Sequence, residues 1–527
     1  MTFRTAPITY TRKENTVPPT TFGDISREHR RSYPSGTAIV DDQHRLTWPE
    51  YDARINQAAH ALQAAGVEEG DRVLWLGQTS FRVFELLGAC AKLGAMLCPA
   101  NWRQSDEEFA FVIDDFDPKV VVWQDEEIGD AVRAASKLTQ RDPVWWQHDT
   151  EGKDSYESAL ATQGADDLWG PVDVDLPLLV IYTAAIDGRP NGSMLTQRNL
   201  LAMAHESSYL TRSDSESVFL NSGPLFHIGN FQWDALAVYL QGGTNVFVPR
   251  IEAEAVLEII TREGVTSAFL MPPTIMQMMQ LYDPDKHDVS RLRGGPFTPL
   301  WNGLLAEDTT PWGSTPGGFG QTEVSGLAVV NGHGGRGQGN SGRPSPLARV
   351  RIVDAEGNEQ PVGSAGEIVV AGDVVHAGYW NRPEINARRM RDGWWHTTDL
   401  GRREDDGSIH FLGTMTRMIK SAAENIYPAE VENCLEQHPA VREAALIGVP
   451  DPQFTQSVKA VVALADGSEV TAEELIEHCR ERIASYKKPR TVEFVNEIPK
   501  RDGVKDYEAL DAMFGGGGYP GGDNVRA

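Results

Sequence analysis

The chain has 527 residues, which is enough for two or more domains. Its 48 basic and 75 acidic residues give a formal net charge of −27, which argues against a nucleic-acid-binding protein because such proteins carry a basic surface. No run of 18 apolar residues is present, so neither a transmembrane helix nor a membrane partner is expected. Four cysteines without a CxxC pair, and an N-terminal stretch without an apolar core, predict free thiols and a cytoplasmic location.

Strand-like and helix-like stretches alternate from about residue 20. Residues 45–67 show a short β-like run followed by helical apolar spacing, and residues 80–101 are typical of a helix followed by a strand. This alternation predicts an α/β fold with largely parallel sheets. Further strands are predicted over residues 71–78, 118–124, 176–183 and 242–249.

The pattern changes twice toward the C-terminus. Residues 348–372 are typical of a strand, a turn and a second strand, which predicts a small β-rich subdomain. From about residue 413 the chain is typical of a compact α+β unit of about 100 residues, an ordinary length for a small domain. We therefore predict a large N-terminal domain over residues 1–413, a small C-terminal domain over 414–514 and a Gly-rich tail over 515–527.

The stretch "IYTAAIDGRPNGSMLT", residues 181–196, has the outline of a phosphate-binding loop. An apolar run leads into a Gly-containing turn and then to Thr196, a candidate helix cap. It lacks the GxxxxGK[ST] pattern, and it places the carboxylate of Asp187 where a bound phosphate would be repelled. Backbone N–H groups of such a turn bind phosphate without side-chain help. Two interpretations stay open, an altered but working loop and the remains of one.

Seven further stretches, in order along the chain, resemble motifs of the acyl-CoA synthetase, adenylation-domain and luciferase superfamily of adenylate-forming enzymes. The resemblance covers about residues 20 to 510. It implies a large N-terminal domain and a small, mobile C-terminal domain. The stretches are "MLTQRNL" (194–200), "PLFHIGN" (224–230), "GFGQTEVSG" (318–326), "GEIVVAGDVVHAGYWNRPE" (366–384), "WWHTTDLGRREDDGSIHFLG" (394–413), "MIKSAAENIYPAEVE" (418–432) and "YKKPRTVEFVNEIPKRDGVK" (486–505).

The resemblance implies a role for several residues of these motifs. Phe319 would stack on adenine, Thr322 would contact phosphate, and Glu323 would help to hold Mg²⁺. Asp399 would bind the ribose hydroxyls, and His227 would lie near the acyl pocket. The remaining nucleotide-binding positions that match are Thr183, Gly188, Arg189 and Gly192 of the loop, together with Gly320 and Lys420.

The same resemblance implies a catalytic lysine near the C-terminus. In the family it lies six residues after the proline of the "IPK" stretch, which here is Pro499, so the implied lysine is Lys505. Lys500 is the nearest competing lysine. The small domain would rotate between two half-reactions, presenting Lys505 in the first and the "KSAAEN" stretch (420–425) in the second.

The chain departs from the family pattern at three places. Asn191 stands where the loop usually has a lysine, and Arg189 is the candidate replacement for its charge. At the hinge, Thr414 and Thr416 replace an arginine that usually contacts ribose and the usual hinge residue. Ala422 and Ala423 replace a Gly-Gly pair beside the channel for the acceptor thiol.

The predicted function is ATP- and Mg²⁺-dependent activation of a carboxylic acid as an acyl-adenylate, followed by thioester formation with CoA. Aromatic pocket candidates favour an aryl or medium-sized apolar acid, and a homodimer is one candidate assembly because dimers are frequent among similar enzymes. One alternative keeps adenylation with another acceptor, namely a carrier protein, an amine, or nitrite activation as in diazotases. The other alternative is a catalytically retired binding protein. The pocket candidates are Phe231, Trp233, Leu270, Met271 and Trp301.

Overall fold

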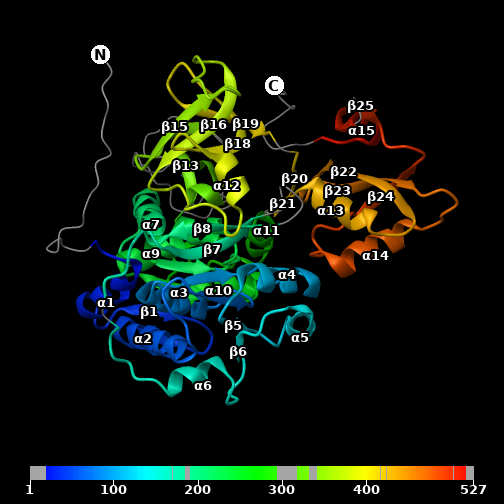
Figure 1. The fold of residues 1–527 in the computed structure, drawn as a ribbon. Helices are drawn as coiled ribbons and strands as arrows, with labels where there is room; N and C mark the ends of the chain where they lie inside the picture. Colours follow the sequence, from blue (N-terminus) through cyan, green and yellow to red (C-terminus); the bar gives the residue numbers. More distant parts are fainter. Residues whose placement is uncertain are drawn as a thin grey trace, which may run out of the picture.

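The computed structural model describes residues 19–168, 170–183, 190–293, 317–331, 341–415, 417–422, 424–501 and 504–517. The chain forms a large N-terminal part and a smaller C-terminal part beside it (Figure 1). The predicted α/β fold is confirmed. No described helix has the length and apolar character needed to cross a bilayer.

Two parallel-rich sheets form the base of the large part. In each sheet a single antiparallel strand pair lies at one edge, β1–β2 in the five-stranded sheet and β7–β8 in the six-stranded sheet. The five-stranded sheet has the order β11 (Ser267–Ala268), β9 (Val218–Asn221), β10 (Thr244–Phe247), β1 (Thr37–Val40), β2 (Arg45–Thr47). The six-stranded sheet has the order β6 (Val144–Gln147), β5 (Val120–Trp123), β3 (Arg72–Leu76), β4 (Met96–Pro99), β7 (Pro177–Thr183), β8 (Asn191–Thr196).

Helices pack against these sheets and enclose separate clusters of buried apolar side chains. Tyr239 stacks on Phe22 with ring centroids 5.3 Å apart and meets Trp48 edge-on at the same distance, so α1, α2 and α9 close on one another. The predicted cap is confirmed, since the Thr196 hydroxyl accepts from the backbone N–H of Asn199. The helices are α1 (Phe22–Ser32), α2 (Trp48–Ala64), α3 (Phe81–Leu93), α4 (Asp106–Phe116), α5 (Gly129–Leu138), α6 (Tyr156–Ala161), α7 (Gln197–Thr211), α8 (Ile228–Asn230), η1 (Phe231–Ala235), α9 (Leu236–Gln241), α10 (Ala253–Glu263) and α11 (Pro272–Leu281).

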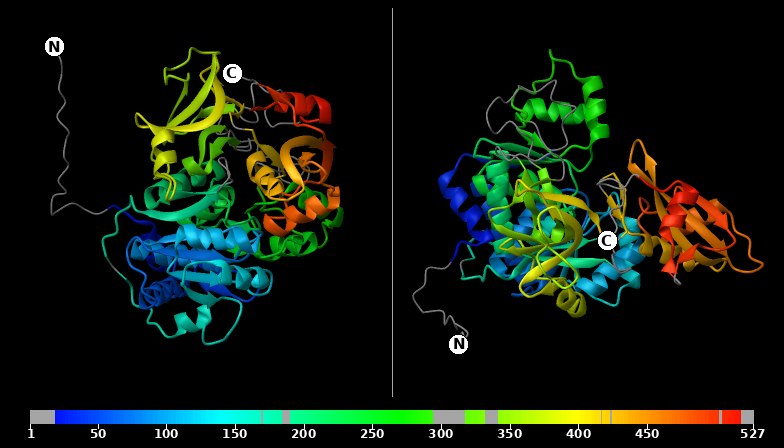
Figure 2. Two further views of the ribbon diagram at one scale, coloured as in Figure 1. Left: turned by 45° about the vertical axis from the view of Figure 1, so that its right-hand side comes forward. Right: turned by 90° about the horizontal axis from the view of Figure 1, so that it is seen from above.

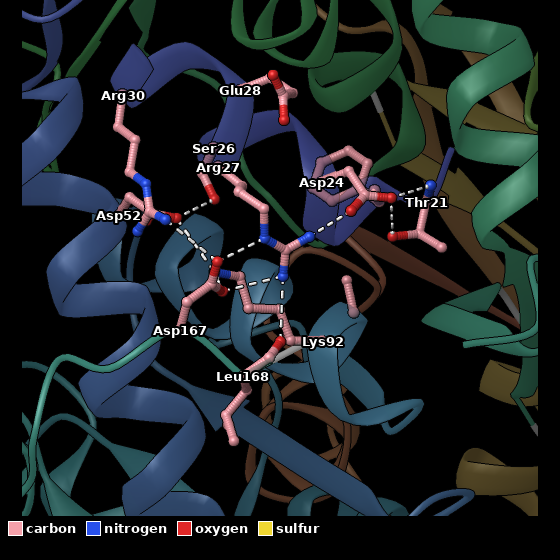
Figure 3. Close-up of polar contacts among 12 residues, drawn as sticks. Thr21, Asp24, Ser26, Arg27, Glu28, Arg30, Asp52, Lys92, Asp167 and Leu168 are labelled. Carbon is pink, nitrogen blue, oxygen red and sulfur yellow. Dashed lines mark hydrogen bonds and ion pairs between the residues drawn. The ribbon is translucent and has the colours of Figure 1, made fainter. Parts of the chain in front are cut away.

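A buried charge network fastens α1 to α2 and α3 (Figure 3). The Lys92 ammonium lies 3.1 Å from Asp52 and 3.3 Å from Asp167, and the side chains of Lys92 and Asp52 are fully buried. Arg27 binds Asp167 and Arg30 binds Asp52, with N–O distances of 2.7 and 2.6 Å. Removing one partner of a buried ion pair costs about 3–5 kcal/mol, so this network fixes the N-terminal helix on the base.

An antiparallel sheet of eight strands stands on the base and forms the predicted β-rich region (Figure 1). Its main path is β12 (Gly317–Gln321), β13 (Gly326–Asn331), β14 (Ser341–Pro344), β19 (Ile409–Thr414), β18 (Trp394–Arg403), β16 (Ala365–Gly372), β15 (Ala348–Val353). The short β17 (Met390–Arg391) pairs with β18, and η2 (Thr322–Val324) and α12 (Pro383–Arg389) complete this part.

The C-terminal part is an α+β unit with its own core, and it lies at one side of the large part (Figure 2). Its sheet has the order β21 (Glu424–Ile426), β20 (Ile419–Ser421), β23 (Thr455–Leu464), β22 (Val441–Asp451), with β24 (Thr491–Val495) parallel to β23. Three helices pack with it, α13 (Pro428–Glu436), α14 (Ala472–Arg482) and α15 (Tyr507–Phe514). The short hairpin β25 (Lys500–Arg501) and β26 (Val504–Lys505) precedes α15.

Candidate active site

The candidate phosphate loop is carried by the β7–β8 hairpin. Thr183 and Asn191 face each other at its stem, and the Thr183 hydroxyl donates to the backbone oxygen of Asn191 at 3.3 Å. Gly192 lies against Val180, where an added Cβ would approach a methyl carbon to 2.9 Å, so close packing explains this glycine. The two other loop predictions, Gly188 and Arg189, lie outside the described residues, as does Asp187.

An arginine that the motifs did not single out supplies positive charge at this stem. Arg382 donates from Nε to the Asn191 side-chain oxygen at 3.0 Å and from Nη2 to the Pro190 carbonyl at 3.3 Å. Its Nη1 binds Asp115 at 2.9 Å, and Tyr182 donates its hydroxyl proton to the same carboxylate at 2.7 Å. A guanidinium from a distant segment therefore stands next to Asn191, the position where the family usually has a lysine.

Glu323 lies buried on η2 below the hairpin. The Tyr379 hydroxyl donates to its Oε1 at 2.6 Å, and the backbone N–H of His376 donates to its carbonyl oxygen at 2.9 Å. Burial raises the pKa of the Glu323 carboxyl, while the Tyr379 hydrogen bond opposes this effect. Thr322, the preceding residue, is only half-buried.

Asp399 lies on β18 close enough to Glu323 for their charges to interact. Burial and then the negative charge of Glu323 raise the pKa of Asp399 to about 8. The Gln321 amide donates to Asp399 at 2.8 Å and accepts from the Trp395 indole N–H at 3.0 Å. The preceding residue, Thr398, has a φ of +58°, which is strained for a β-branched residue. Gln321, two residues before Glu323, therefore links these two buried carboxyl groups, and a cation or sugar hydroxyls would offset the negative charge that they carry when ionised.

Glu323 and Thr322 fit the Mg²⁺ that the family implies. They offer hard oxygen ligands, and Mg²⁺ usually keeps several waters and phosphate oxygens, so few protein ligands suffice. Within the described ranges, no group of three or more His, Cys, Asp or Glu residues forms a self-sufficient metal site. This donor set suits a cation that arrives with its nucleotide better than a permanently bound one.

The glycines around Phe319 are explained by backbone packing. A Cβ at Gly320 would lie 1.6 Å from the carbonyl oxygen of Gly326, so only glycine lets β12 approach β13. Phe319 itself is 6% exposed and stacks on Phe411 with centroids 5.3 Å apart. Its predicted stacking on adenine stays a prediction, and it depends on the ring face that Phe411 does not cover.

Of the residues predicted to line the acyl pocket, two are buried in apolar core clusters and two are not described in full. Phe231 is fully buried and stacks on Phe84 in the central core, and Leu270 belongs to a second core cluster. Trp233 belongs to η1, where the structure describes its backbone but not its side chain. Trp301 lies outside the described residues. The pocket that selects the acid therefore stays a prediction.

The small part turns its Lys420–Glu424 loop toward the large part. His227 Nε2 lies 3.1 Å from Glu424 Oε2, and Arg103 donates to Glu424 Oε1 at 3.0 Å. Burial raises the pKa of Glu424, but His227 and Arg103 outweigh it, and the net shift is downward. Lys420 donates to Asn425 at 2.7 Å, and burial lowers its pKa. His227 and Glu424 thus meet where the two parts touch, which motif spacing alone does not indicate.

Lys505 lies elsewhere in the small part. Its ammonium binds Glu432 at 2.9 Å and Glu436 at 3.2 Å, and both glutamates belong to α13. Burial lowers the pKa of Lys505, but the two carboxylates outweigh this effect and raise it. The structure therefore brings Glu323 and Asp399 together, and it does not bring Lys505 to them. Lys500, the competing lysine, pairs with Glu443 at 3.1 Å.

Ala422 follows β20, close in sequence to Glu424, and has an unusual backbone conformation. Its φ is +53°, in the left-handed region that favours glycine, and its N–H donates to the Phe454 carbonyl at 2.7 Å. We expect Ala422→Gly to raise the free energy of unfolding by up to about 1 kcal/mol, because it removes this strain. If the methyl group also narrows the thiol channel, the KM for CoA falls and the rate of pyrophosphate exchange stays unchanged. A lower melting temperature with an unchanged KM contradicts both parts of this prediction.

The comparisons with known proteins agree with these motifs. The family model "AMP-binding enzyme" matches residues 26–380, and "AMP-binding enzyme C-terminal domain" matches residues 430–503. A feruloyl-CoA synthase from an Amycolatopsis species is 35% identical over 89% of this chain and 94% of its own length. An indoleacetate–CoA ligase from Aromatoleum aromaticum is 31% identical over 90% of this chain and 94% of its own. The amide bond synthetase McbA from Marinactinospora thermotolerans has a similar structure, with a TM-score of 0.79, 25% identity, and coverage of 93% of this chain and 99% of that one. The resemblance is thereby confirmed, and the chain belongs to the family of AMP-binding enzymes.

Proposed function

We propose that the protein is an ATP-dependent, AMP-forming acid–CoA ligase that activates an aryl or medium-sized apolar carboxylic acid. The observation that carries the proposal is the placement of buried Glu323 beside Thr322 on η2 and of buried Asp399 on β18, with Gln321 linking the two segments. Relatives at 31–35% identity bear the names of a feruloyl-CoA synthase and an indoleacetate–CoA ligase. Both names denote aryl acids, which supports the proposed substrate class.

We assign the nucleotide-binding roles as follows. Ionised Asp399 accepts hydrogen bonds from the two ribose hydroxyls, Thr322 contacts phosphate, and Phe319 borders the adenine. Glu323 with Thr322 would hold Mg²⁺, which when bound offsets the negative charge of the phosphates. Around the phosphates, loop N–H groups act together with Thr183 and Arg189, and Arg382, which is paired with Asp115, orients Asn191 at the stem.

The arrangement of the two parts supports the second half-reaction. Glu424 contacts His227 while Lys505 is held by its own domain, so the small part presents the Lys420–Glu424 loop and not the lysine. We propose that adenylation uses another arrangement, in which Lys505 reaches the phosphates. The domain boundaries at 413/414 and 514/515, a homodimer and a cytoplasmic location are further parts of this proposal.

The test is pyrophosphate release with ATP and Mg²⁺ across a panel of aryl and aliphatic acids and nitrite, each with and without CoA. We expect release with an aryl acid and acyl-CoA formation only when CoA is present. If pyrophosphate release does not depend on CoA but increases with an amine or a carrier protein, the acid–CoA ligase is contradicted and an adenylate-forming enzyme with that other acceptor is indicated. If no acid gives pyrophosphate release and calorimetry shows that ATP does not bind, the result indicates a catalytically retired binding protein.

A further inference from the structure

A buried cluster of three charges joins the small part to the large part away from the candidate active site. Lys487, between α14 and β24, binds Glu430 of α13 at 2.6 Å and Glu108 of α4 at 2.8 Å. The three side chains are between 5% and 12% exposed. We call Glu108, Glu430 and Lys487 the interdomain cluster. Only its Glu108 belongs to the large part.

Neighbouring contacts run between the same two short segments. The Ser105 hydroxyl, which caps α4, donates to the carbonyl oxygen of Arg482 at the end of α14 at 2.8 Å. Asn101 donates to the Tyr486 hydroxyl at 3.2 Å. Figures 1 and 2 show α4 and α14 side by side at this edge, in agreement with these contacts. The segments 101–108 and 482–487 therefore form one continuous docking surface.

The charge balance of the interdomain cluster suits a contact that forms and breaks. Two carboxylates share one ammonium, and Glu430 Oε2 has no hydrogen-bond partner among the residues that the structure describes. If the small part moves away, Lys487 keeps Glu430 and Glu108 regains water, so neither domain retains an isolated buried charge. A buried cluster with a surplus carboxylate holds the parts together less firmly than an apolar interface of the same size would.

We propose that Glu108 and Lys487 form an interdomain latch that stabilises the arrangement used for thioester formation. This inference rests on the proposed function for its kinetic consequence, but the latch itself is a structural property of the chain. Glu108 and Lys487 are positioning residues, because they lie away from the nucleotide site and act by holding the Lys420–Glu424 loop against His227.

The test uses Glu108→Gln and Glu108→Lys. Glutamine keeps the capping box with Ser105, since Gln serves at that position as well as Glu, whereas lysine places a like charge opposite Lys487. Glu107→Gln and Glu107→Lys are matched controls in the same helical turn, where Glu107 is exposed. Two quantities are measured for each variant: the scattering radius of gyration, and the rates of the two half-reactions, pyrophosphate exchange and acyl transfer from preformed acyl-adenylate to CoA.

We expect Glu108→Gln to slow acyl transfer about 10-fold and Glu108→Lys to slow it more, with pyrophosphate exchange unchanged or faster and a larger radius of gyration. The Glu107 controls stay within about 2-fold of the wild type. Unchanged scattering and unchanged transfer overturn the latch, and so does an equal loss of both half-reactions, which indicates general damage. If the wild-type protein forms no thioester, the proposed function is contradicted but the latch is not. The latch is then still tested by comparing the radius of gyration of the Glu108 variants with that of the wild type.

Discussion

Replacing Lys505 with alanine is expected to reduce pyrophosphate exchange by about 10²–10³-fold. Adenylation brings two anions together, and the alanine variant lacks the cation that would offset their charge. Acyl transfer from preformed acyl-adenylate to CoA should change by less than about 2-fold. In the observed arrangement Lys505 is bound to Glu432 and Glu436, so we expect the second half-reaction to proceed without it. The measurement is a comparison of the two half-reactions in one preparation of the variant.

Lys500→Ala is the matched control for this prediction. Lys500 lies on the other strand of the same short hairpin, pairs with a single glutamate and is 42% exposed, so its loss removes a similar charge from the same region. Its effect on either half-reaction should stay within about 2-fold. Equal losses from the two variants contradict the assignment of Lys505, and a loss of acyl transfer in Lys505→Ala contradicts the separation of the two arrangements.

The order of strands and helices was predictable because it depends on local pattern. Residues 45–67 contain a β-like run followed by helical spacing, and the structure has β2 and α2 there. Glycines near Phe319 matched a motif, and the structure explains them by the close approach of β12 to β13. Such features are recoverable from sequence since each is set by neighbouring residues or by one strand pair.

The partners of the site residues could not be predicted in the same way. The Arg382 contact to Asn191 and the Tyr379 contact to Glu323 join segments 191 and 56 residues apart, and spacing carries no information about which side chains meet. Arg189 is the replacement cation that the loop sequence predicts, whereas the motif over residues 366–384 implies no role for Arg382. The contacts of Glu424 with His227 and Arg103 depend in addition on how the two parts are arranged, which a single sequence does not encode as a local pattern.

Asp399→Asn is expected to stabilise the protein above about pH 4 and at the same time to weaken ATP binding. The pKa of Asp399 is about 8 in the folded protein, against an ordinary value of about 4 in the unfolded chain. Between these values the unfolded state binds fewer protons than the folded state, so this group lowers the free energy of unfolding as pH rises from 4 to 8. The loss reaches on the order of 5 kcal/mol at pH 8 and above, and asparagine, which does not ionise, removes it.

The same substitution removes the charged acceptor proposed for the two ribose hydroxyls. Hydrogen bonds to a charged group contribute about 1.5–3 kcal/mol each, so the KM for ATP should rise by about 100-fold or more at pH 8. Thermal unfolding of the wild type and Asp399→Asn at pH 5 and pH 8 checks the stability, and Asp405→Asn, an exposed turn residue nearby, is the control. The expected pattern is a melting temperature that rises at pH 8 far more than at pH 5 while ATP binding weakens. An unaltered KM removes Asp399 from the nucleotide site, and a lower melting temperature at pH 8 shows that the aspartate is ionised and satisfied there. A gain in stability with a loss of binding means that the fold keeps a destabilising buried carboxyl at this position because the nucleotide requires it.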